Sequence, residues 1–95
     1  MKHQITEITV ASLDYPSLEK ASQVIKRYFE EAYLEVKGPM KIKARYIKHN
    51  GSSVKESRIR LSVKGEIGSE MIKGLEFLPV SKNCTFSFSV QSNDL

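Results

Sequence analysis

The fold of this chain is decided by residues 40–64, which read MKIKARYIKHNGSSVKESRIRLSVK. Two runs of alternating apolar and polar residues flank Asn50-Gly51, and such alternation is typical of strands with one buried face. Asn-Gly between two such runs is the strongest short-range hairpin signal, because both residues tolerate positive φ. The stretch therefore predicts a β-hairpin.

Whether the loop has an even or an odd number of residues decides which side chains of this hairpin share a face. A two-residue Asn50-Gly51 turn predicts these pairs: Ile42 with Ile59, Met40 with Leu61, Lys43 with Arg58, and Arg45 with Glu56. A four-residue loop moves every pair by two positions, which leaves the faces unchanged because side chains alternate with period two. Either loop predicts this inward set: Met40, Ile42, Ala44, Ile59, Leu61 and Val63.

Basic residues concentrate on the other face of the hairpin. The chain has a formal net charge of +4, yet residues 38–64 carry eight basic groups against Glu56 alone. Like charges directly opposite each other destabilise a sheet, so we expect an anionic partner to offset the repulsion. The candidate binding residues are Lys41, Lys43, Arg45, Arg58, Arg60 and Lys64. The alternative is a solvated sheet face whose lysines discourage edge-to-edge aggregation.

A long helix is predicted between a first strand and the hairpin. Residues 4–13 are rich in β-branched types and indicate a strand. Asp14-Tyr15-Pro16-Ser17 reads as a helix start, with Asp14 capping free backbone amides, and Gly38-Pro39 as its end. One apolar stripe runs between these signals at three- and four-residue steps. It consists of Leu18, Ala21, Ile25, Phe29, Ala32 and Val36.

The last third of the chain is less regular. Three glycines interrupt residues 65–80, where the sequence allows either a short helix opening at 69–72 or a further strand bulged at Gly74. Residues 84–91 then alternate cleanly and predict a half-buried strand that begins at Cys84. We expect residues 92–95 to fray.

These elements predict a single α+β domain spanning residues 1–95. One long amphipathic helix packs on a mostly antiparallel sheet of about four to five strands, in the order β-α-β-β-(short element)-β. No apolar run approaches the ~20 residues that span a bilayer, and no secretory signal is evident, so we expect no membrane contact. Because the lone Cys84 has no internal disulfide partner, a reducing, cytoplasmic location is favoured.

No motif predicts catalysis, a metal or a cofactor. Both histidines, His3 and His49, lack partners at metal-ligand spacing. Cys84 opens an apolar alternation, which favours a small core residue over a nucleophile. The glycine-rich stretch lacks the spacing of a phosphate-binding loop. We therefore expect a binding module and not an enzyme.

Two partner classes fit the basic hairpin. The first is nucleic acid, DNA or RNA, contacted mainly at phosphates, because Tyr46 falls in the apolar set and leaves no aromatic among the basic positions. The second is an acidic protein surface, which would make the chain a protein-binding module or a small inhibitor of the kind that phages and mobile elements encode. A third, weaker hypothesis is a homodimer formed through an edge strand, at residues 4–13 or 84–91.

Overall fold

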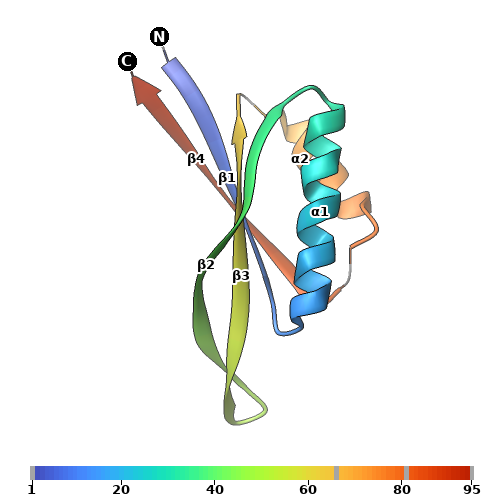
Figure 1. Ribbon diagram of the computed structural model, residues 1–95, viewed down its shortest axis with the longest axis vertical. Helices are drawn as coiled ribbons and strands as arrows, with labels where there is room; N and C mark the ends of the chain where they lie inside the picture. The colour runs from blue at the N-terminus through green and yellow to red at the C-terminus, as the bar shows by residue number, and fades with distance from the viewer. Residues whose placement is uncertain (1, 66, 81, 95) are drawn as a thin grey trace.

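The computed structural model describes residues 2–65, 67–80 and 82–94. Its elements follow the predicted order (Figure 1). They are β1 (Lys2–Ser12), α1 (Tyr15–Glu31), β2 (Glu35–His49), β3 (Ser52–Lys64), α2 (Ser69–Gly74), a 3-10 turn (Leu75–Phe77) and β4 (Cys84–Asp94).

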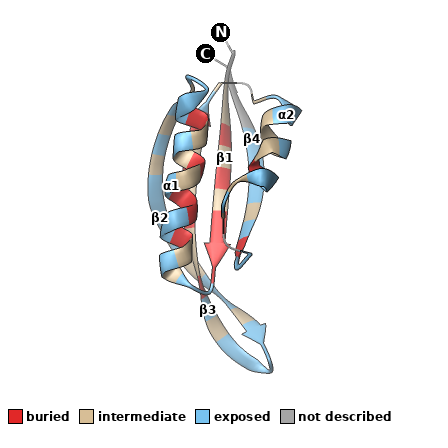
Figure 2. Ribbon diagram, turned by 90° about the vertical axis from the view of Figure 1, so that its right-hand side faces the viewer, coloured by how far each residue is buried: buried red, intermediate tan, exposed pale blue. Residues whose placement is uncertain are grey.

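The described strands form one four-stranded sheet in the order β2-β3-β1-β4, with every neighbouring pair antiparallel. Both helices lie on the same side of this sheet (Figures 1 and 2). The β-α-β-β-α-β order with this pairing is the ferredoxin-like arrangement, and it confirms the predicted α+β class. β1 is paired along both of its sides, so residues 4–13 do not offer the free edge that a strand-added dimer needs.

The core lies between α1 and the strands, with Leu75 of the 3-10 turn closing one end. Four members of the predicted helical stripe, Leu18, Ala21, Ile25 and Phe29, are buried. In Figure 2 the buried positions follow the inner side of α1 and the centre of the sheet, whereas the far end of the hairpin is exposed. The buried cluster comprises Ile8, Val10, Leu18, Ala21, Ile25, Phe29, Ile59, Leu61, Val63, Leu75 and Cys84.

The two ends of α1 depart from prediction. Asp14 is the N-cap residue, but its carboxylate accepts a hydrogen bond from the Ser17 hydroxyl instead of from a backbone amide. The helix ends at Glu31, well before Gly38-Pro39, because Tyr33 adopts a left-handed conformation with φ 63°. Val36 has the spacing of the helical stripe, yet it lies in β2 opposite Val63. Its side chain packs against the core from the strand, as it would have done from a helix.

Of the two loop lengths that the sequence allowed, the hairpin has the two-residue turn, with His49 opposite Ser52 and both Asn50 and Gly51 at positive φ. The predicted pair of Arg45 with Glu56 is also present. Beyond it the register shifts by one residue between Ile42 and Arg45, and again between Lys37 and Met40.

These bulges make part of the predicted face assignment wrong. A one-residue shift turns the following side chains to the opposite face. Met40 therefore lies opposite Arg60 and is 62% exposed, while Lys41 lies opposite Ile59 on the helix side. The second bulge restores the parity, which returns Val36 to the core side.

Residues 65–80 contain a short helix, which resolves the open choice between helix and strand. The Tyr28 hydroxyl donates a hydrogen bond to the Met71 carbonyl at 2.9 Å and ties α2 to α1. β4 then pairs with β1 without a register shift, from Cys84 opposite Ser12 to Asp94 opposite Lys2. Of the tail expected to fray, 92–94 thus continue this strand, and Leu95 lies outside the described residues.

Candidate nucleic-acid interface

The far half of the hairpin projects from the body of the protein as a two-stranded ribbon (Figure 1). Pairing between β1 and β3 stops at Ser12 opposite Ser57, and from Glu56 to the turn β3 pairs with β2 alone among the described strands. We refer to residues 43–58 as the arm. No hydrophobic residue of the arm belongs to the buried core, so its sequence is not constrained by core packing.

The arm carries all of the net charge of the chain. Five of the fifteen basic residues lie in it, against one of the eleven acidic residues. The other 79 residues therefore hold ten charges of each sign and balance to zero. Clustered charge of one sign on a protruding element creates a stronger local electrostatic field than the same net charge of +4 would if it were spread over the whole surface.

Two of the six predicted binding residues lie on the body and face carboxylates. The Arg60 Nε is 3.5 Å from a carboxylate oxygen of Glu7, and the Lys64 Nζ is 4.0 Å from one of Glu35. Glu7 and Glu35 come from β1 and β2 on either side of β3, a neighbourhood that hairpin pairing alone did not reveal. The basic face that was expected along the whole hairpin is therefore interrupted on the body by these two carboxylates.

Arg45 also has an acidic partner. Its Nε donates to the Glu56 Oε1 at 2.5 Å, and Glu56 is 7% exposed although it lies on the arm. The Arg45 side chain remains 57% exposed. The pair therefore anchors the base of the arm while leaving part of the guanidinium accessible to solvent.

Arg58 spans the bulge nearest the arm. Its Nε and Nη2 donate to the Lys43 carbonyl at 2.9 and 2.6 Å, which occupies a backbone acceptor next to the register shift. Lys41 lies on the helix side, with its Nζ 4.5 Å from the centre of the Tyr15 ring. Neither contact neutralises the positive charge of the side chain, because a carbonyl oxygen and an aromatic ring carry no formal charge.

The bulge creates a shallow depression at the base of the arm. It brings together three of the predicted residues, Lys41, Lys43 and Arg58, and adds Lys55, which was not among the six predicted residues. The rest of its described lining is uncharged and consists of Ile42, Ala44, Tyr46 and Ser57. Four cations without a lining carboxylate suit an anion such as a phosphate.

Tyr46, which the alternation places with the apolar set of the hairpin, is exposed. It is 72% exposed and lies opposite Lys55. The expected absence of an aromatic residue among the basic positions is therefore wrong. Tyr46 lies on the arm, where neither of the described helices covers its face, and no sequence signal marked where that coverage ends.

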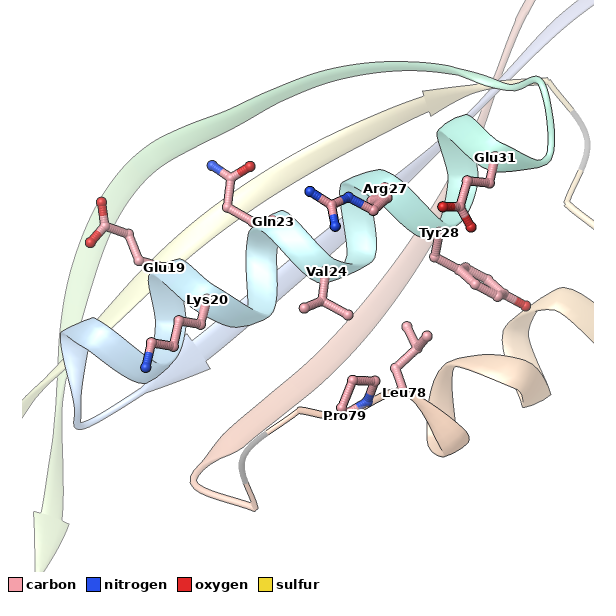
Figure 3. Close-up of a pocket in the computed structure, with 9 residues that line it drawn as sticks. All are labelled: Glu19, Lys20, Gln23, Val24, Arg27, Tyr28, Glu31, Leu78 and Pro79. Atoms are coloured by element: carbon pink, nitrogen blue, oxygen red, sulfur yellow. The ribbon is translucent and has the colours of Figure 1, made fainter.

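A groove of about 700 Å³ lies between α1 and the segment after the 3-10 turn (Figure 3). Val24, Tyr28, Leu78 and Pro79 form its apolar part. Its charged lining alternates in sign, with Glu19 and Glu31 near Lys20 and Arg27, so its field is weaker than that of the arm.

Other chemistry-bearing groups are dispersed. Within the described residues, no three His, Cys, Asp or Glu side chains are grouped to hold a metal ion. Burial raises the pKa of the Cys84 thiol, and this effect outweighs an opposing hydrogen bond with Ser12. A thiol held protonated is a poor nucleophile, because the thiolate is the reactive form.

The sequence matches no protein-family model, and no curated protein resembles it significantly. Across the described part of the chain, no helix is both long and apolar enough to cross a bilayer.

Proposed function

We propose that the protein binds nucleic acid through the arm, with a phosphate seated in the depression at its base. The observation that carries the proposal is the lining of that depression, which combines four cations with Tyr46 and contains no carboxylate among its described residues. The proposal narrows the predicted site. It retains Lys41, Lys43 and Arg58 and adds Lys55 and Tyr46. It leaves out Arg45, Arg60 and Lys64, which face acidic neighbours.

The shape of the arm supports the same partner. A two-stranded ribbon fits the major groove of duplex DNA, and it also lies readily along a phosphate backbone. Lys48 and Lys55 sit at exposed positions on the two strands, so a bound backbone meets cations along the ribbon as well as at its base. Exposed Tyr46 offers a ring on which a base can stack, worth about 1–3 kcal/mol per base.

Affinity measurements at several salt concentrations test this function, with random-sequence RNA and duplex DNA of equal length as probes. Binding should weaken steeply with salt, since each neutralised phosphate releases counterions. In the Lys43→Ala/Lys55→Ala variant, the slope of log K against log salt should become shallower by about 2. Tyr46→Ala should weaken single-strand binding with little change in that slope, because stacking involves no counterion.

A charge-matched control is Lys73→Ala/Lys82→Ala, which removes two exposed lysines outside the arm. This variant should retain the salt slope of the original protein. If neither probe binds at low salt, the proposed nucleic-acid binding is wrong. If both double variants lose affinity equally, the proposed binding through the arm is wrong. Equal affinity for polyglutamate and for nucleic acid would instead favour the alternative partner, an acidic protein surface.

A further inference from the structure

The two edges of the sheet differ in their protection against pairing with another strand. The β2 edge contains two register shifts, Pro39 and several lysines, all of which are devices that hinder strand addition. The β4 edge has none of these. Residues 84–93 include no charged residue and no proline, and β4 keeps an unshifted register with β1 along its full length.

β4 also carries exposed apolar side chains. Phe88 and Val90 project on the helix side of the sheet, since they lie opposite the buried Ile8 and Thr6 of β1. They are nevertheless 40% and 60% exposed. Phe86, one step nearer the loop, packs against the core as a half-buried residue. The apolar side of the strand therefore remains partly uncovered toward the free edge.

The order of residues in β4 is self-complementary about Phe88. When the strand is laid antiparallel to itself with Phe88 opposite Phe88, Phe86 meets Val90 on the helix side. Ser87 meets Ser89 on the opposite side, and no like charges oppose each other because the segment is neutral. Among registers centred on a residue of this strand, centring on Phe88 is the one in which Phe86, Phe88 and Val90 meet only one another.

We propose that two copies of the chain associate through β4, antiparallel and centred on Phe88, to form a continuous eight-stranded sheet. The occupant of the edge is a second copy, because the alternation of both faces and the lack of charge match the strand to itself. Main-chain hydrogen bonds supply the pairing, and the apolar side chains exclude water beside it. This inference goes beyond nucleic-acid binding and does not depend on it. The arms lie at the outer ends of such a sheet, because β2 and β3 are farthest from β4.

A charge-exchange experiment tests the contact between two β4 strands. Ser87→Lys/Ser89→Lys places lysines opposite lysines across the two-fold axis, and Ser87→Glu/Ser89→Glu does the same with glutamates. Both serines are exposed, so the changes leave the core unaltered. In sedimentation over a wide concentration range, the original chain should dimerise and each variant should sediment as a monomer. An equimolar mixture of the two variants should recover the dimer, now with opposite charges paired.

The matched control is Met40→Lys, which adds a charge to the β2 edge at a residue as exposed as Val90. This variant should still dimerise, and circular dichroism should show that all variants are folded. A chain that remains monomeric at its highest concentration overturns the proposal. A dimer that persists in both serine variants places the contact elsewhere and overturns it equally.

Discussion

Tyr28 joins the two helices through a side-chain hydrogen bond. Its ring packs edge-on to Phe29 with centroids 5.2 Å apart, and its hydroxyl donates to the Met71 carbonyl. Gly74 lies so close that a Cβ at this position would overlap the Tyr28 hydroxyl. Close approach, and not the backbone angle, therefore disfavours a side chain at position 74.

This contact leads to the first prediction. Gly74→Ala should lower the free energy of unfolding by about 1 kcal/mol, because the added methyl group displaces the tyrosine hydroxyl and breaks its hydrogen bond. Urea unfolding measures the loss. Tyr28→Phe should cost a similar amount in the original chain and almost nothing in the Gly74→Ala background, since the bond is already lost there. If the stability losses of the two substitutions simply add in the double variant, the added methyl group does not act by displacing the Tyr28 hydroxyl.

At the scale of elements, the hairpin combines two functions in one pair of strands. Its near half completes the sheet and contributes Ile59, Leu61 and Val63 to the core. Its far half, the arm, is exposed and basic. The bulge between Ile42 and Arg45 marks the boundary, and the pair of Arg45 with Glu56 lies immediately beyond it.

Glu56 provides a prediction at this scale, because it is the one acidic residue of the arm. Glu56→Gln keeps the side chain's size, releases Arg45 and raises the arm's net charge by one. The proposed function then requires tighter nucleic-acid binding and a salt slope steeper by about 1. The stability cost should stay near 1 kcal/mol, because Arg45 is largely solvated. Unchanged or weaker binding would contradict a role for the arm's charge.

At the scale of the whole molecule, the body and the arm should be separable. The Cα trace extends 48 × 28 × 20 Å, and the arm projects along the longest dimension. Stability is expected to arise from the packing of α1 on the sheet, because burial of apolar surface is the main favourable term in folding. The arm contributes little to that burial.

A shortened hairpin tests this separation. Deleting residues 46–49 and 52–55 joins Arg45 to Asn50 and Gly51 to Glu56, which preserves the two-residue turn and the faces of the remaining strands. The melting temperature should change by only a few degrees, whereas nucleic-acid affinity should fall to the level of non-specific contact. A deletion variant that binds as tightly as the full chain would place the interface on the body.

Sequence alone determined the order of the four strands and the long helix, the position of the hairpin and the apolar stripe of α1, because each depends on local periodicity and on residues with restricted φ. It left open whether residues 65–80 contain a helix or a strand, and whether the hairpin loop has two residues or four. It also located the basic segment, since charge can be counted along the chain. It did not determine the end of α1, because Val36 satisfies both a helical and a strand pattern.

Tertiary structure alone decided the faces of the basic residues. Two bulges in β2 changed which side chains share a face, and the neighbouring strands supplied Glu7 and Glu35 as partners for Arg60 and Lys64. It also exposed Tyr46, because α1 is too short to cover the arm. Alternation assigns side chains to two faces, but only the packed fold determines which parts of those faces reach solvent.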